Sequence, residues 1–283
     1  MLLQPMVTII VAVLNNVNGI KRCLDSIANQ TYSNIELLIM DGGSVDGTIE
    51  VLKRCNGIIT YWESVSDRGL YHAWNKALLR AHGEWIYFIG ADDILWDNHV
   101  INNFVQYLER ESPDGKIIYG QVCVINEDQD IIKLMGEPWE QAKDKMSKYL
   151  SIPHQGVMHH RSLFDEFGYF DEKLKMSGDY EFLLRLYKNV NICHIPNFII
   201  AGMGSGGMST DRNLTTARLI EDLRARRQNK LKLVSWYWVK GYFMATVRSL
   251  LVKLVGEKKV RHLNRLRSRL SGSNALLKKT FNK

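Results

Sequence analysis

The chain has 283 residues, of which 46% are hydrophobic and 24% charged, so it is long enough to bury the core of one large domain, or of one domain with an extension. Its four cysteines show no CxxC spacing, which argues against metal-clip and disulfide frameworks and predicts reduced cytosolic thiols. The first residues, MLLQPMVTIIVAVL, carry no basic region and no small-residue cleavage site, so we expect a lead-in and a first strand rather than a signal peptide.

The charge is unevenly distributed. Residues 218–283 hold 18 Lys and Arg against 3 Asp and Glu, whereas the rest of the chain holds 19 against 27. An acidic body with a strongly basic tail predicts two parts with different partners.

Strand-like and helix-like segments alternate along the first half of the chain. This alternation predicts a mostly parallel sheet with right-handed crossovers. Ligands bind beyond the carboxyl ends of the strands in such sheets. The expected strands are Val7–Leu14, Ile35–Met40, Ile58–Trp62 and Trp85–Ile89, and the expected helices are Ile20–Ala28, Ile49–Arg54 and Leu70–Ala81.

Polar side chains gather at the expected carboxyl edge. The stretch GEWIYFIGADD is a buried-strand pattern that delivers two adjacent carboxylates, Asp92 and Asp93,. Carboxylates are costly in a core unless something pairs with them, and a divalent cation with a bound diphosphate is such a partner. A solvated turn after the strand is the alternative, because such turns favour Asp. Asn15, Asp41 and Asp67 fall at or near the same edge.

The segment DGGSVDGT, from Asp41 to Thr48, sits at a strand end and opens a helix. Its glycines allow a ligand to approach the backbone closely, and its carboxylate can accept hydrogen bonds from a base edge or from ribose hydroxyls. A turn with an Asp or Ser helix cap is the alternative. Neither a P-loop nor a GxGxxG dinucleotide fingerprint is present,.

The second half has a different pattern. Residues 117–125 and 131–134 predict a hairpin. Segments 161–167 and 178–187 predict helices, 191–200 a further strand, and the glycine-rich segment 201–211 a flexible loop.

Three ordered motifs carry a resemblance. VTIIVAVLNN with DGGSVDGT, then SDRGLYHAWNKAL, then GEWIYFIGADD resemble the family 2 glycosyltransferases with the GT-A fold. The likeness covers about residues 6–210 and is greatest to the bacterial branch that builds capsule, O-antigen and colanic-acid-type repeat units. It implies an α/β, Rossmann-like, mostly parallel central sheet flanked by helices, a nucleotide-sugar donor, Mn²⁺ or Mg²⁺, and inverting transfer of a hexosyl or N-acetylhexosaminyl group.

The resemblance also assigns roles to residues. It implies that Asp41 contacts the pyrimidine base of the donor and that Asp67, with Arg68 beside it, lies next to the nucleoside. Asn15 is expected to bind the donor. Asp92 and Asp93 match the metal motif, with Asp93 the expected direct ligand.

The helix motif departs from its relatives. Members of this branch often read GxYDAMNK, whereas this chain reads GLYHAWNK, with His72 for an acid and Trp74 for a Met. If that acid touches the donor, sugar or nucleotide preference differs here. The favoured alternative is that position 72 is an exposed helix residue that varies freely.

An inverting transfer needs a carboxylate that takes the proton of the acceptor hydroxyl. The resemblance assigns this role to Asp179, at the start of a helix, where capping is the alternative role. Glu181, two positions on, points to a different side of that helix. His154, Arg185 and Gly206 are expected near the acceptor or the phosphates; for His154 a structural role is equally plausible, and the loop that holds Gly206 is either a lid or a connector.

The chain is expected to divide into a catalytic domain, 1–215, and a basic helical extension, 216–283. Residues 1–115 of the domain bind the nucleotide sugar and 116–215 the acceptor. Lys240 and Arg248 interrupt the apolar run of the extension, so it falls short of a spanning helix,. Its aromatics mixed with Lys and Arg suit a helix lying on anionic lipid. A helical cap packed on the catalytic domain is the alternative, and no nucleic-acid motif accompanies the charge.

We therefore expect a glycosyltransferase on the inner face of the plasma membrane, with a polyprenyl-linked saccharide as acceptor. A non-catalytic nucleotide-sugar-binding scaffold subunit is the main alternative. A nucleotidyltransferase is a third hypothesis, although Asn15–Gly19 supplies no basic glycine-rich loop.

Overall fold

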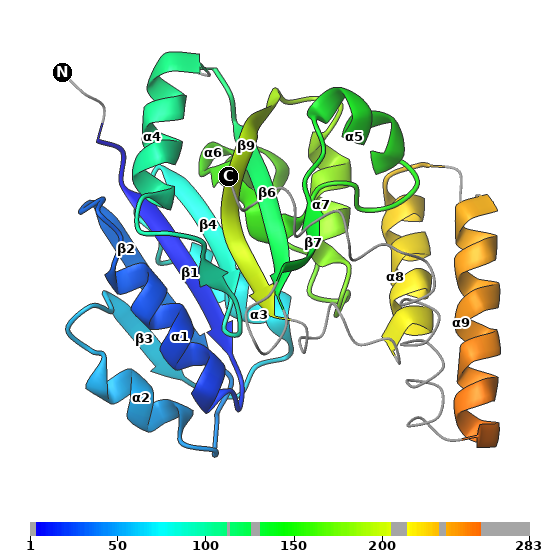
Figure 1. Cartoon of the computed structure of the whole chain (residues 1–283), viewed down its shortest axis with the longest axis horizontal. Coiled ribbons are helices and arrows are strands. Elements are labelled where there is room, and N and C mark those ends of the chain that lie inside the picture. Colours follow the sequence, from blue (N-terminus) through cyan, green and yellow to red (C-terminus); the bar gives the residue numbers. More distant parts are fainter. Residues whose placement is uncertain (1–3, 112–113, 126–130, 205–213, 232–235, 256–283) are drawn as a thin grey trace.

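A computed structural model describes residues 4–111, 114–125, 131–204, 214–231 and 236–255 of the chain. Gly206 and the basic residues beyond position 255 lie outside the described residues. The described strands form one sheet between two layers of helices, and two further helices stand side by side at one end of the molecule (Figure 1).

The sheet has the strand order β3-β2-β1-β4-β8-β6-β9-β5, and β7 pairs with β6. The strands are β1 (Val7–Val13), β2 (Ile35–Asp41), β3 (Tyr61–Ser64), β4 (Trp85–Gly90), β5 (Ile94–Leu95), β6 (Ile117–Ile125), β7 (Ile131–Met135), β8 (Val157–His160) and β9 (Ile192–Gly204).

The first four strands are parallel, as predicted. The prediction of a mostly parallel central sheet is confirmed only in part, because β8 runs antiparallel to both β4 and β6, whereas β9 runs parallel to β6. The 117–125 and 131–134 hairpin is confirmed as β6 and β7. The sheet is therefore mixed, with parallel pairs among the four strands of the first 90 residues and between β6 and β9.

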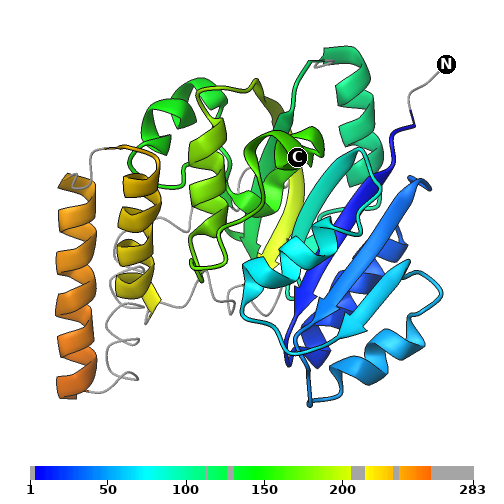
Figure 2. The same ribbon diagram turned by 180° about the vertical axis from the view of Figure 1, so that it is seen from behind.

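Alternating side chains of the strands face the two helical layers. On one face Ile9 and Tyr87 belong to a core with α1, α2 and α4. On the other, Ile10 and Phe88 belong to a core with α3, α5, α6 and α7, which Figure 2 shows from behind. The helices of these layers are α1 (Val17–Ala28), α2 (Thr48–Arg54), α3 (Leu70–Leu78), α4 (Val100–Glu111), α5 (Trp139–Met146), α6 (Ser162–Phe167) and α7 (Gly178–Leu186).

Two helices follow β9 in the sequence. Helix α8 (Thr215–Gln228) lies beside α7, and α9 (Trp236–Val255) lies on the outer side of α8 (Figure 1). The indole Nε1 of Trp238 donates to the carbonyl of Leu219 at 2.8 Å and so joins α9 to α8. None of the described helices combines the length and the apolar character needed to cross a bilayer.

Candidate active site

A cleft of about 930 Å³ opens where β1 and β4 end. Four residues singled out from the sequence line it, and they come from both halves of the chain: Asp92, Asp93, His154 and Asp179. The acid pair follows β4, and Asp179 lies in the first turn of α7. The fold thus brings the expected metal ligands and the expected base to one cavity, although about 85 residues separate them in the sequence.

The acid pair is placed where a negative charge is costly. Asp93 is only 3% exposed. Burial, and then the charge of Asp92, raise the pKa of Asp93 to about 7, although backbone hydrogen bonds act in the other direction,. One of these bonds comes from the amide of Gly204 at 3.3 Å. A cation beside the pair would relieve this cost.

Glycine at position 90 keeps space around the pair. A methyl group on Gly90 would lie 2.6 Å from Oδ2 of Asp93 and 3.1 Å from Oδ1 of Asp92, so a larger residue would displace the carboxylates. Two hard oxygen ligands suit Mg²⁺ or Mn²⁺, which take their other ligands from water and phosphate. Among the described residues no group of three or more His, Cys, Asp or Glu side chains gathers as a metal cage. The pair therefore fits a cation that a diphosphate shares.

Asp179 is oriented by a residue of the first half of the chain. Its Oδ1 accepts a hydrogen bond from the hydroxyl of Tyr71 at 3.0 Å and another from the amide of Tyr180 at 2.8 Å. Tyr71 belongs to α3 and is 2% exposed. Its ring packs so closely on Gly178 that a methyl group there would lie 2.8 Å from the ring. The start of α7 is therefore seated directly on α3.

Two aromatic side chains also line the cleft. Trp74 and His154 stack with ring centroids 5.2 Å apart at an angle of 21°. Burial lowers the pKa of His154, while the charge of Asp179 raises it, and the imidazole is neutral at pH 7,. Neither Nε1 of Trp74 nor Nε2 of His154 has a hydrogen-bond partner within the described part of the chain. His154 is thus not a fully satisfied structural histidine.

The loop after β2 is organised around Asp41. Asp41 is fully buried, and its carboxylate accepts hydrogen bonds from the amides of Gly43 and Ser44, at 3.1 and 2.9 Å, and from the hydroxyls of Ser44 and Ser64. The amide of Asn15 donates to the Ser44 hydroxyl at 2.7 Å. Neither Asp41 nor Asn15 lines the cleft. The hydrogen bonds of Asp41 therefore fix the conformation of this loop.

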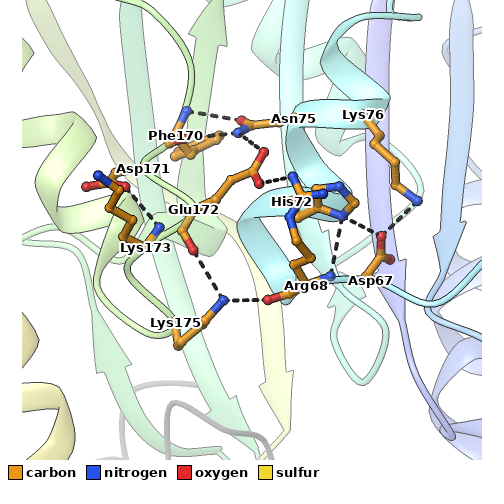
Figure 3. Close-up of polar contacts among 10 residues, drawn as sticks. All are labelled: Asp67, Arg68, His72, Asn75, Lys76, Phe170, Asp171, Glu172, Lys173 and Lys175. Carbon is orange, nitrogen blue, oxygen red and sulfur yellow. Dashed lines mark hydrogen bonds and ion pairs between the residues drawn. The ribbon is translucent and has the colours of Figure 1, made fainter.

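Asp67 and Arg68 take part in the polar network of Figure 3. Asp67 contacts His72 at 2.9 Å and Lys76 at 2.8 Å, and Arg68 contacts Glu172 at 2.6 Å. The side chain of His72 is only 15% exposed. The interpretation of position 72 as an exposed helix residue is therefore wrong, because the side chain of His72 is largely buried against Asp67.

Arg185 lies outside the cleft lining. Its guanidinium donates to the carbonyls of Phe167 and Tyr169, at 2.5 and 2.8 Å, and contacts Glu181 at 2.9 Å. It also lies over the ring of Phe182. These contacts give Arg185 a structural role at the end of α6, which does not support the expected acceptor or phosphate contact.

The comparison with protein families decides the identity of the chain. Residues 8–168, more than half of the sequence, match the family described as Glycosyl transferase family 2. The chain belongs to this family. A PGL/p-HBAD biosynthesis glycosyltransferase from Mycobacterium bovis is 29% identical over 192 residues, which cover 65% of this chain and 71% of the relative.

Solved structures share the fold of this family 2 member. The mannosyltransferase PcManGT from Pyrobaculum calidifontis, in complex with GDP-Man and Mn²⁺, aligns with a TM-score of 0.63 at 17% identity, over 95% of this chain and 81% of that one. Staphylococcus aureus TarS in complex with UDP-GlcNAc aligns with a TM-score of 0.64 at 15% identity, over 84% and 70%. The fold is thus GT-A-like, with a mixed sheet between helices.

Several residues of the site were not predicted from the sequence of this family 2 member. Tyr71 precedes Trp74 and Leu78 by three and seven positions, so helical periodicity places it on their buried face. Glu221 and Asp222 are two of the three acids among residues 218–283. Two adjacent acids in an otherwise basic segment are the sequence feature that indicates a separate role for α8.

Proposed function

We propose that this chain is a metal-dependent, inverting glycosyltransferase of bacterial surface-polysaccharide synthesis. It would move a hexosyl or N-acetylhexosaminyl group from a nucleotide sugar to a polyprenyl-linked saccharide. The observation that carries the proposal is the shared cleft, which Asp92, Asp93 and Asp179 line together. The structural neighbours in complex with GDP-Man and UDP-GlcNAc support a donor of this kind.

The roles follow from the positions of the acids. Asp93 and Asp92 would hold Mn²⁺ or Mg²⁺ together with the donor diphosphate. The cation, when bound, neutralises charge on the leaving nucleoside diphosphate. Asp41 and Asn15 would shape the loop at the nucleoside end, with Asp67 and Arg68 beside it.

Asp179 is the proposed base. A hydroxyl of the acceptor forms a bond to C1 of the sugar, the bond from C1 to the diphosphate oxygen breaks, and the hydroxyl proton passes to Asp179. Tyr71 and the Tyr180 amide both donate to Oδ1. We therefore assign the proton to Oδ2. His154, neutral beside the acids, would hydrogen-bond a sugar or phosphate oxygen.

Helix α9 is the proposed membrane contact. Trp236 is 79% exposed and Phe243 64% exposed, and Lys240 is exposed between them. Large apolar side chains mixed with basic ones suit the interface of an anionic bilayer. We propose that the protein binds the inner face of the plasma membrane through this helix and the basic residues that follow it in the sequence.

A thermal-shift experiment tests the donor proposal. UDP-GlcNAc and GDP-mannose are added separately with Mn²⁺ or with excess EDTA. A donor that binds only the folded state at 100 times its Kd stabilises the protein by about 2.7 kcal/mol. We expect one of the two to raise Tm with Mn²⁺ and to lose most of that effect in EDTA, and we expect Asp93→Asn to show no such rise. An equal rise in EDTA would remove the metal from the proposal.

A further inference from the structure

The helix that carries Asp179 begins in an unusual way. Ser177 occupies the position before α7, where a serine hydroxyl ordinarily bonds to an amide of the first turn, but here its side chain makes no such bond,. The Ser177 hydroxyl donates instead to Oδ1 of Asp222 in α8, at 2.7 Å. The start of the catalytic helix is thus tied to a helix that follows it by about 40 residues in the sequence.

Glu221 of α8 makes the larger set of contacts. Its carboxylate accepts hydrogen bonds from three consecutive amides, those of Lys175, Met176 and Ser177, at distances of 2.7 to 3.1 Å. Glu221 is 7% exposed. Hydrogen bonds to an ionised carboxylate are about twice as strong as neutral ones. A negative charge is also favoured before a helix N-terminus, so this carboxylate fixes the backbone that leads into α7.

The loop is held from a second side as well. Nζ of Lys175 donates to the carbonyl of Arg68, in the segment that leads into α3 (Figure 3). The backbone from Lys175 to Ser177 is therefore fixed between α8 and the start of α3. Asp179 follows this backbone by two residues, and Tyr71 of α3 holds its carboxylate.

Helix α8 also reaches the cleft directly. Arg218, Leu219 and Asp222 line the same cavity as Asp93 and Asp179. Burial raises the pKa of Asp222 to about 6, while its bond to Ser177 lowers it. The matched family region ends at residue 168, so these contacts lie beyond the part of the chain that the family match covers.

We propose that Glu221 is a positioning residue for Asp179, and that the face of α8 with Glu221 and Asp222 is a part of the catalytic domain, so that α8 is not the first helix of a separate basic extension. This inference rests on the proposed role of Asp179 as the base. Displacement of a reacting group by about 1 Å can cost on the order of 100-fold in rate, so the carboxylate that fixes residues 175–177 controls turnover without touching the substrate.

Glu221→Gln is the decisive variant, because it keeps the shape and removes the charge and one acceptor oxygen. Release of nucleoside diphosphate from UDP-GlcNAc or GDP-mannose with Mn²⁺ is the readout. We expect kcat to fall by about 10- to 100-fold and KM for the donor to change less than about threefold, because the donor contacts lie elsewhere. Arg224→Gln, on the exposed face of the same helix, is the matched control and should retain kcat.

The double variant separates positioning from plain stability. In an Asp179→Asn background Glu221→Gln should cause no further loss of kcat, because the group that it positions is already absent. Losses that multiply in the double variant would overturn the proposal. The proposal would also be overturned if the wild type turned over a donor and Glu221→Gln had a normal kcat. If the wild type turned over neither donor, the proposed function itself would be contradicted.

Hydrogen exchange is measured on the wild type, so this test does not depend on the folding of any variant. The amides of residues 175–177 lie outside any helix or strand, yet bonds to Glu221 should make them exchange as slowly as the first turn of α7. Exchange of this segment as rapid as that of an exposed loop would contradict the proposed hold of Glu221 on the start of α7.

Discussion

Two buried histidines beside the cleft have pKa values that burial shifts downward. His159 is fully buried among the rings of Phe88, Phe164 and Phe182. Burial, and then the proximity of His154, lower the pKa of His159 well below its ordinary value of 6.5,. Below pH 6.5 the unfolded chain therefore takes up a proton that the folded protein does not. The stability contributed by neutral His159 is present above pH 6.5 and is lost as the pH falls.

The downward shift in the pKa of His159 gives a measurable prediction for the pH dependence of stability. Between pH 7.5 and 5.5 the protonation of one such histidine in the unfolded state costs about 1.4 kcal/mol of unfolding free energy. The His159→Phe variant should escape that loss, so its stability should fall by about 1.4 kcal/mol less than that of the wild type over this interval. Urea unfolding at the two pH values measures the difference. His99→Gln, at an exposed position, is the control. If the unfolding free energy of His159→Phe fell between the two pH values by as much as that of the wild type, the prediction would be contradicted.

At the residue scale, the sequence predicts those parts of the site that follow a strand or open a helix. Asp92, Asp93 and Asp179 belong to this class, and all three line the cleft. Tyr71 and Glu221 act through contacts with residues that lie 108 and 44–46 positions away. No local pattern records such a pairing, so only the folded chain reveals it.

At the element scale, the packing of the start of α7 on α3 joins the two halves of the chain. A methyl group on Gly178 would lie 2.8 Å from the ring of Tyr71. Gly178→Ala should therefore push the start of α7 away and cost about 1–3 kcal/mol of stability, with a loss of turnover as Asp179 moves. Gly57→Ala is the matched control, because a methyl group there meets nothing within 4 Å.

Thermal unfolding and turnover of the two variants check this packing. We expect a lower Tm and a lower kcat in Gly178→Ala alone. Equal Tm and kcat values for Gly178→Ala and Gly57→Ala would show that α7 can move freely relative to α3.

Element boundaries were predicted best for the buried parallel strands. Strands β1, β2 and β4 lie within one residue of their expected bounds, whereas helix α1 begins at Val17, three residues before the expected Ile20. Strand β8 was missed because it has four residues, VMHH, and half of them are histidines. Its antiparallel pairing with β4 makes the sheet mixed, and a pairing between segments about 70 residues apart has no periodic signature.

At the scale of the whole molecule, a chain of contacts runs from the outer helix to the cleft. Trp238 of α9 bonds to Leu219 of α8, and Glu221 of α8 holds the loop before Asp179. A membrane bound at α9 would therefore lie on the side of the molecule from which α8 reaches the site. This arrangement suits an acceptor that is anchored in lipid.

Sedimentation with phosphatidylglycerol vesicles tests this orientation. Burying one Phe-sized side chain contributes about 1.5–3 kcal/mol, so Trp236→Ser with Phe243→Ser should weaken vesicle binding by at least about tenfold. Leu79→Ser, which removes a side chain that is 69% exposed at the end of α3, is the control and should bind as the wild type does. Binding that is equal in all three proteins would contradict a membrane contact through α9.

If the acid pair and Asp179 act on one sugar in one cleft, the Asp179→Asn variant separates donor binding from proton transfer. Asparagine keeps an oxygen for the Tyr71 hydroxyl and removes the proton acceptor. We expect Asp179→Asn to retain the Mn²⁺-dependent thermal shift with its nucleotide sugar while kcat falls by about 10²- to 10⁴-fold. Near-normal turnover in Asp179→Asn would rule out Asp179 as the base of this cleft.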